Sequence, residues 1–296
     1  MQKGTIKLIA FLMGMLLALM TIFNSMLGVR TTQEASLIAN HIVGIAVMSV
    51  LIAAGRNNAA IRPKPGKLAW YLHFGGLFGV VLMLFNNIAV LGCGATVAMA
   101  SAVFGQCFTG LLFDCTGFLG MKKRPLTKRK LLSLAVSCLG IMIMVFLSGE
   151  AFSLLYVLMA FLAGALLMTQ MVHNSFVSAR KGPFFSALLN NTGGLIALTL
   201  LAMVVKPEAT LEGLKALGTV NPLLVAAGGG TGIIITTTVC TIIPKIPGAV
   251  SSLLMSAGQI LAGLPLDYLL FHRFSPALLI GAIVMVLGLV LDKAEN

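Results

Sequence analysis

Apolar segments recur along the whole chain, and this repetition restricts the fold more than any other feature of the sequence. Each segment has about 20 residues, enough for a helix to cross a hydrocarbon core about 30 Å thick. The chain is 58% hydrophobic and only 9% charged, whereas soluble domains carry about 25% charged residues. Because backbone groups in lipid must pair within their own segment, we expect an all-α membrane protein.

Polar breaks divide the chain into ten expected transmembrane helices. Their approximate ranges are 6–29, 35–54, 68–91, 96–118, 131–147, 153–179, 183–205, 221–243, 249–271 and 276–291. Ten crossings place both termini on one side of the membrane. That side holds 16 of the 20 Lys and Arg residues, which predicts that both termini are cytoplasmic.

The two halves of the sequence resemble each other. A shift of 150 residues aligns Asn24 with Asn174, Arg30 with Arg180, and Asn40 with Asn190. A shift of 153 residues aligns later positions, with Gly75-Gly76 on Gly228-Gly229, Gln106 on Gln259, and Asp114 on Asp267. Polar residues are rare in membrane helices, so their coincidence indicates an internal duplication.

This duplication predicts two five-helix repeats, residues 1–150 and 151–296. Because five is an odd number, the second repeat must enter the membrane from the opposite face. Inverted repeats of this kind are typical of secondary transporters, whose substrate site lies near the midplane where the repeats meet.

Three motifs carry a resemblance to a known family. They are Asn24-Ser25-x-Leu27-Gly28, the glycine-rich segment from Gly75, and Gly105-Gln106 leading to Asp114 and the turn Gly117–Gly120. In these motifs the chain resembles the YdcZ-like branch of the drug/metabolite transporter superfamily, with two family units fused. The resemblance implies small-molecule transport across a bacterial inner (plasma) membrane and leaves the substrate undefined.

Amides are the main candidates for substrate binding. Gln106 and Gln259 fall near the middle of their helices, where they either contact a polar substrate or bond a neighbouring helix. Asn24 and Asn174 lie near the ends of their helices, and Asn40 and Asn190 lie near the starts of the next. These four asparagines either fix the helical hairpins or line the access pathway.

Two further candidates have no polar counterpart in the first half. Gln170 and His173 share a helix face with Asn174, whereas the aligned residues are Met20 and Phe23. This asymmetry is expected to orient a substrate, and a histidine here is also able to couple protons. The alternative is that His173 is a hydrogen-bonded core residue.

Asp114 and Asp267 are the only carboxylates expected inside helices, each near one membrane face. Arg180 is expected on the same face as Asp114, and Arg30 on the same face as Asp267. We therefore predict alternating gates, Asp114 with Arg180 and Asp267 with Arg30. Solvation, or pairing with a loop lysine, is the alternative for either acid.

Several function classes are excluded by what the sequence lacks. It contains no Walker loop, no zinc-protease motif and no nucleophile-base set, so we expect neither an enzyme nor an ATP-driven pump. The cysteine spacing supports no metal site, and no cofactor is expected. The basic residues lie in short loops rather than along an aromatic-lined stripe, which argues against nucleic-acid binding.

The sequence thus predicts a monomeric secondary transporter that moves a small polar metabolite, neutral or zwitterionic, by alternating access. Its expected partners are this substrate and membrane lipid. A flippase for a lipid-linked or amphiphilic substrate and a cationic drug exporter are the alternatives. Segment 6–29 has no acidic residue near its middle, unlike the small multidrug-resistance proteins of the same superfamily, and this counts against the second alternative.

Overall fold

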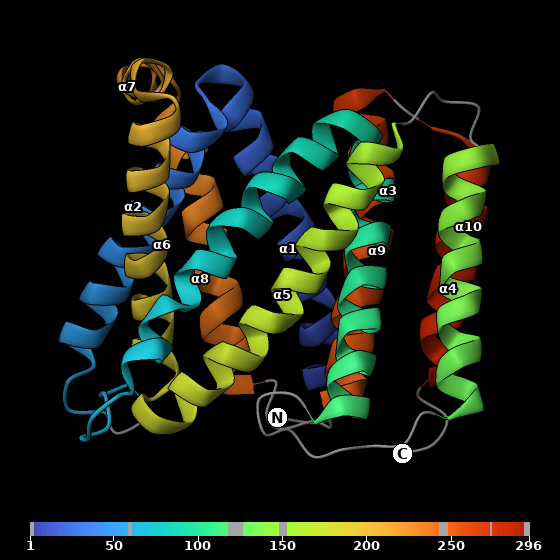
Figure 1. The fold of residues 1–296 in the computed structure, drawn as a ribbon, viewed down its shortest axis with the longest axis horizontal. Coiled ribbons are helices and arrows are strands. Elements are labelled where there is room, and N and C mark those ends of the chain that lie inside the picture. Colours follow the sequence, from blue (N-terminus) through green and yellow to red (C-terminus); the bar gives the residue numbers. More distant parts are fainter. Residues whose placement is uncertain are drawn as a thin grey trace. The chain divides into compact units, whose positions relative to one another are not determined.

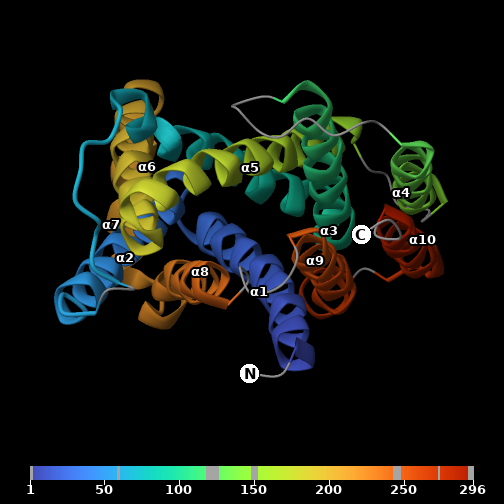
Figure 2. The ribbon, with the colours of Figure 1, turned by 90° about the horizontal axis from the view of Figure 1, so that it is seen from below.

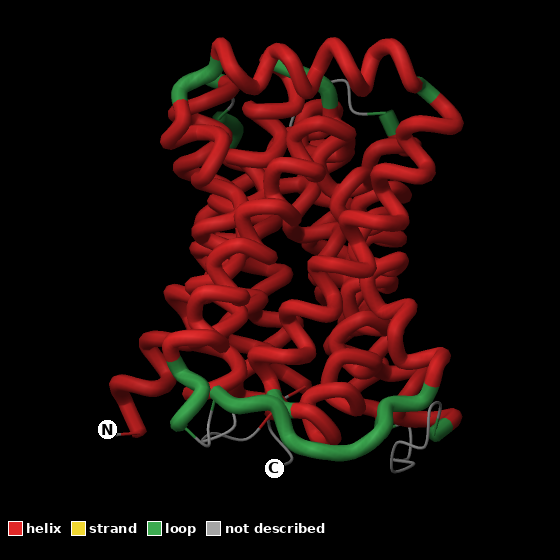
Figure 3. The backbone as a smooth tube through the Cα atoms, turned by 90° about the vertical axis from the view of Figure 1, so that its left-hand side faces the viewer, coloured by secondary structure: helices red, strands yellow, loops and turns green. Residues whose placement is uncertain are grey.

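The structure is a computed structural model that describes residues 3–58, 61–117, 127–147, 153–242, 248–272 and 274–292. The elements are α1 (Lys3–Arg30), α2 (Gln33–Ala54), η1 (Trp70–Phe74), α3 (Gly75–Thr116), α4 (Lys128–Leu147), α5 (Leu154–Lys181), α6 (Pro183–Val205), α7 (Pro207–Ala216), η3 (Leu217–Thr219), α8 (Pro222–Ile242), α9 (Gly248–Phe271) and α10 (Pro276–Asp292). Figure 1 labels the α-helices. The described backbone consists of helices joined by loops and contains no strand (Figure 3). The prediction of an all-α membrane protein is confirmed.

The number of ten transmembrane spans stays a prediction. Among the described residues, six helices are long and apolar enough to cross a bilayer, and the bent pair Pro207–Thr219 and Pro222–Ile235, at 106°, makes up to seven. The helices Leu254–Leu270 and Pro276–Gly288 are apolar but shorter. One of the six, Trp70–Phe113, contains most of two predicted segments.

A break at Gly94 divides α3 into two helical segments. Its backbone, at φ +81° and ψ 164°, lies in a region that glycine adopts readily and other residues avoid. The predicted segments 68–91 and 96–118 lie on either side of this residue. Segment 68–91 begins differently from the prediction, because Trp70–Phe74 is a 3-10 helix whose Trp70, Tyr71 and Phe74 are exposed. Exposed aromatic rings at a helix end suit the membrane–water interface.

The helices form two compact units, and each unit takes residues from both sequence halves. Unit 1 comprises Met1–Leu19, Ile88–Met168 and Ile242–Asn296, and unit 2 comprises Met20–Asn87 and Thr169–Thr241. The unit boundaries fall inside α1, α3 and α5 and before the last residue of α8. The units are therefore a different division of the chain from the sequence repeats.

Glycines of one repeat pack against the backbone of the other repeat within unit 1. A Cβ at Gly14 would collide with the Met255 carbonyl, and one at the aligned Gly164 would collide with the Ala102 carbonyl. Met255 and Ala102 are themselves aligned by the 153-residue shift. The two contacts therefore join equivalent positions of the repeats. Helices α4 and α10 also pair closely in this unit and lie side by side in Figure 2.

Unit 2 shows the same reciprocity in its hydrogen bonds. Ser36 Oγ donates to the Asn24 carbonyl at 2.7 Å, and the aligned Ser186 Oγ donates to the Asn174 carbonyl at 3.1 Å. Each bond ties the start of one helix to the end of the preceding helix. Hydroxyl groups therefore help to close the hairpins α1–α2 and α5–α6.

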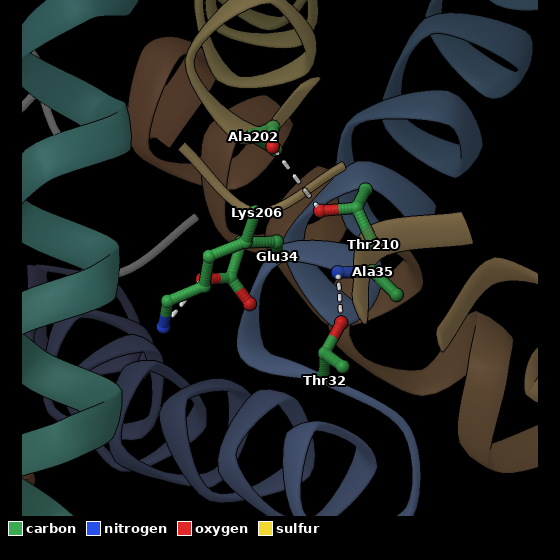
Figure 4. Close-up of polar contacts among 6 residues, drawn as sticks. All are labelled: Thr32, Glu34, Ala35, Ala202, Lys206 and Thr210. Carbon is green, nitrogen blue, oxygen red and sulfur yellow. Dashed lines mark hydrogen bonds and ion pairs between the residues drawn. The ribbon is translucent and has the colours of Figure 1, made fainter. Parts of the chain in front are cut away.

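Helix α7 occupies a region for which the sequence predicted no helix. Its Pro207 stands at the first helical position, where a missing N–H costs no hydrogen bond. Figure 4 shows its contacts: Thr210 Oγ1 donates to the Ala202 carbonyl at 3.5 Å, and Lys206 Nζ lies 3.6 Å from Glu34 Oε1. Thr32 caps the start of α2 by accepting from the Ala35 N–H at 3.1 Å. Within unit 2, α7 thus packs on the α1–α2 turn.

Candidate functional site

The crossing of α2 and α6 lies at the centre of the polar residues in unit 2. His41 Nδ1 and Asn191 Oδ1 are 3.2 Å apart, and these two residues are aligned by the 150-residue shift. The aligned glycines Gly44 and Gly194 make room for the pair, because a Cβ at Gly44 would collide with Asn191 and one at Gly194 with His41. The contact therefore joins equivalent positions of the two repeats.

Four predicted site residues of the second repeat come together beside this crossing. Gln170 Nε2 donates to Asn190 Oδ1 at 3.0 Å and to the Gly75 carbonyl at 3.4 Å. The His173 ring covers Gly75, and Asn174 Oδ1 would lie 3.3 Å from a Cβ at that glycine. We call Gln170, His173, Asn174 and Asn190 the His173 cluster.

The His173 cluster borders a narrow crevice. His173, Asn174 and Asn190 line it together with Leu72, His73, Gly75, Val177, Ser186 and Leu189. The crevice has an empty volume of about 150 Å³, none of it wide enough for a water molecule. Both ring nitrogens of His173 are buried and have no hydrogen-bond partner among the described residues. This state is unusual, since buried polar groups are normally paired.

The two aligned residues of the first repeat form a second group, which we call the Asn24 cluster. Asn24 is 2% exposed and Asn40 is 6% exposed. The side-chain oxygens of both residues lack a hydrogen-bond partner in the described part of the chain. Both oxygens approach Gly228 of α8, where a Cβ would lie 3.2 Å from Asn40 Oδ1 and closer still to Asn24 Oδ1.

The remaining amide candidates lie in unit 1. Gln259 is 3% exposed, and its Nε2 lies 3.4 Å from the Met99 sulfur. Gln106 Nε2 is buried without a hydrogen-bond partner among the described residues. Unit 2 therefore contains the four candidate asparagines, Gln170 and His173, whereas unit 1 contains Gln106 and Gln259.

The predicted gate residues have different surroundings. The Asp267 carboxylate is buried and accepts the N–H groups of Ala95 and Thr96 at 2.5 and 2.7 Å, directly after the break at Gly94. It thus caps the second segment of α3 and complements its helix dipole. Arg30 and Arg180 are exposed, and Arg180 Nη1 donates to the Phe176 carbonyl at 3.2 Å. The side chain of Asp114 lies outside the described residues.

A polar network in the first repeat was not predicted from the sequence. Asn86 Nδ2 donates to Thr21 Oγ1 and Asn87 Nδ2 donates to Gln33 Oε1, both at 3.2 Å. Ser25 Oγ lies 3.4 Å from the Asn87 carbonyl. An Asn-Asn pair inside an apolar segment was the available signal, because amides in membrane helices need partners.

One family matches almost the whole chain. Its description is "Putative inner membrane exporter, YdcZ", and it matches twice, at residues 5–143 and 155–291. The chain belongs to the YdcZ family. The predicted fusion of two family units is confirmed by the double match, and the described apolar helices agree with a multi-pass inner-membrane protein.

The other comparisons concern the fold alone. A protein known from a crystal structure aligns with 97% of this YdcZ-family chain and 99% of its own length, at 19% identity and a TM-score of 0.52. No curated protein sequence matches the chain.

Proposed function

We propose that this chain is a secondary carrier that exports a small polar metabolite, neutral or zwitterionic, by alternating access. In this proposal ten transmembrane helices form two inverted repeats. The supporting observation is that the Asn24 and His173 clusters occupy aligned positions of the two repeats within one unit. Polar groups in membrane helices are costly and mark substrate pathways when they have no structural partner.

Glycine-rich helices cover both clusters. Gly75 lies over the His173 ring, and Gly228 lies over the Asn24 and Asn40 oxygens. If the repeats are inverted, the two clusters lie toward opposite membrane faces. Withdrawal of α3 then opens one cluster, and withdrawal of α8 opens the other. Because glycines form the covering surfaces, the helices close tightly without side chains that would fill the sites.

The chemistry of the clusters favours an uncharged or zwitterionic substrate. No Lys, Arg, Asp or Glu lines the crevice at His173 among the described residues. The available groups are amides, a hydroxyl and imidazole rings, which bind polar groups through hydrogen bonds rather than through a net charge. The outward direction rests on the description of the family as exporters.

The predicted gates remain part of this proposal. Asp114 with Arg180 and Asp267 with Arg30 would close the pathway in alternation. For Asp267, opening of its gate would leave the carboxylate on the N–H groups of Ala95 and Thr96, as found here. The acid therefore has a partner in either state and never remains buried and unpaired.

Thermal stabilisation of the purified protein against a panel of metabolites tests the substrate class. The panel contains amino acids, nucleobases, sugars, quaternary amines and short lipids, with Asn24→Ala, Asn174→Ala, Gln106→Ala and Gln259→Ala beside the wild type. A ligand that binds the folded state raises stability by RT ln(1 + [L]/Kd). A shift with a small polar compound that the asparagine variants lose supports the proposal. Shifts with amphiphiles alone or quaternary cations alone would instead favour a flippase or a drug exporter.

Alternating access needs a separate measurement. Single-cysteine variants Asn24→Cys and Asn174→Cys, in a background without the native cysteines, are alkylated in membrane vesicles. The stabilising compound is expected to change the two labelling rates in opposite directions. Parallel changes at both positions would contradict alternation.

A further inference from the structure

We propose that Asn24 and Asn40 form an acceptor subsite for an N–H group of the substrate, a primary ammonium or a carboxamide, covered by Gly228 of α8. The inference rests on the proposed carrier function and specifies which substrate group the first repeat recognises. It assigns the two asparagines a ligand chemistry that differs from that of the His173 cluster.

Convergence of the two oxygens is the first observation. Asn24 and Asn40 come from different helices, α1 and α2, and both are more than nine-tenths buried. Their Oδ1 atoms approach the same glycine, and neither has a hydrogen-bond donor among the described residues. A buried acceptor without a donor is destabilising, so two such acceptors beside the same glycine require an explanation.

Comparison with the second repeat supplies that explanation. There, Gln170 Nε2 donates to the oxygen of Asn190, the residue aligned with Asn40. Gln170 also stands 2.6 Å from a Cβ placed at Gly79. In the first repeat, Met20 occupies the aligned position, and its sulfur stands 3.2 Å from a Cβ placed at the aligned Gly232. The Met20 thioether has no N–H to donate, so the Asn40 oxygen is left free.

The free oxygens define the ligand group. An amide oxygen accepts hydrogen bonds and donates none, so its partner must carry N–H or O–H. A primary ammonium has three donors directed from one atom, which suits two converging acceptors. A carboxylate has no donor and is excluded. When α8 withdraws Gly228, the ligand group takes the place of the glycine.

Pairs of small compounds that differ only in N–H groups test the subsite directly. Methylammonium is compared with tetramethylammonium, and acetamide with N,N-dimethylacetamide, at matched ionic strength. Methylammonium and acetamide are expected to raise the Tm of the purified protein by about 1 °C at a concentration equal to their Kd. Equal or larger shifts with the fully methylated compounds would overturn the proposal. It would also be overturned if neither methylammonium nor acetamide produced a shift.

Repeat-matched variants separate ligand binding from stability. Asn24→Leu and Asn40→Leu should abolish the methylammonium shift with little change in Tm, because each removes an unpaired acceptor and Asn40 loses in addition only the contact of its Nδ2 with the Met83 sulfur at 3.9 Å. Asn190→Leu is the control: it should lower Tm by about 2 °C or more, since Gln170 loses its partner, and leave the methylammonium shift intact. Loss of the shift in Asn190→Leu alone would overturn the assignment to the first repeat.

The most specific variant is Met20→Gln, which copies the second repeat into the first. The new amide should donate to Asn40, raise Tm by about 2 °C and abolish the methylammonium shift. A variant of lower Tm that still responds to methylammonium would contradict the comparison between the repeats. Failure of the subsite can be told from failure of the carrier proposal. If methylammonium and acetamide produce no shift, but panel compounds stabilise the wild type and not Asn174→Ala, the carrier proposal stands and the subsite is rejected.

Discussion

In both units the repeats meet through glycine contacts, but unit 2 adds a contact between two aligned side chains. In unit 1 glycines pack on carbonyls, such as Gly14 on Met255 and Gly164 on Ala102. In unit 2 Gly76 packs on the Asn190 carbonyl and Gly229 on the Asn40 carbonyl, and His41 contacts Asn191. Close backbone packing tolerates no change of volume, whereas a hydrogen-bonded contact can exchange partners. We therefore expect unit 1 to be the more rigid unit and unit 2 to recognise the proposed ligand.

The largest expected effect is at the glycine contacts of unit 1. Gly14→Ala places a methyl group on the Met255 carbonyl, so the protein should lose more than about 3 kcal/mol or fail to fold. The yield of monodisperse protein and its Tm measure this. Gly4→Ala is the control in the same helix, because a Cβ there meets no atom within 4 Å. Similar outcomes for both variants would remove the argument that unit 1 is rigid.

The next largest effect concerns Asp267. Asp267→Leu leaves the Ala95 and Thr96 N–H groups without their carboxylate, and should cost about 3 kcal/mol. Asp267→Asn keeps an acceptor and should cost about half as much. Hydrogen exchange at Ala95 and Thr96 is expected to accelerate in the leucine variant. Unchanged exchange would show that the cap contributes little, and non-additive effects of Asp267→Asn and Arg30→Ala would favour the gate instead.

A smaller effect is expected where the repeats meet in unit 2. Asn191→Leu removes the contact with His41 and the bond from Asn191 Nδ2 to the Ala187 carbonyl, and should cost about 1–2 kcal/mol. Thr192→Val is the neighbouring control, because it removes only a hydroxyl bonded to the Leu188 carbonyl of its own helix. Thermal unfolding compares the two. A larger loss in Thr192→Val would contradict a special role for the α2–α6 crossing.

The smallest effect is expected at the surface of unit 2. Lys206→Ala breaks the contact with Glu34, but the lysine side chain is 61% exposed, so stability should change by less than about 0.5 kcal/mol. Thr32→Ala removes the cap of α2 and should cost about 1 kcal/mol. If Lys206→Ala lost more stability than Thr32→Ala, the ion pair with Glu34 would be the main attachment of α7.

The sequence predicted those features that repeat along it. Asn24, Asn40, Asn174 and Asn190 stood out because amides are rare in apolar helices, and the structure places them in two aligned groups. Helix α7 was missed because it is too short and too polar to count as a membrane segment, although Pro207 at its start and its Ala, Leu and Glu residues favour a helix. The Asp267 contact was missed because it joins residues 171 and 172 positions apart. Spacing along one helix carries no information on such a partner.

The contact between His41 and Asn191 has a consequence for the evolutionary history of the chain. In an assembly of two identical subunits, a residue beside the symmetry axis faces its own copy, and a histidine would face a histidine. A complementary pair of unlike residues at aligned positions requires two copies whose sequences mutate independently. The two repeats of this chain meet that condition, so their aligned positions can become chemically different, as His41 and Asn191 have.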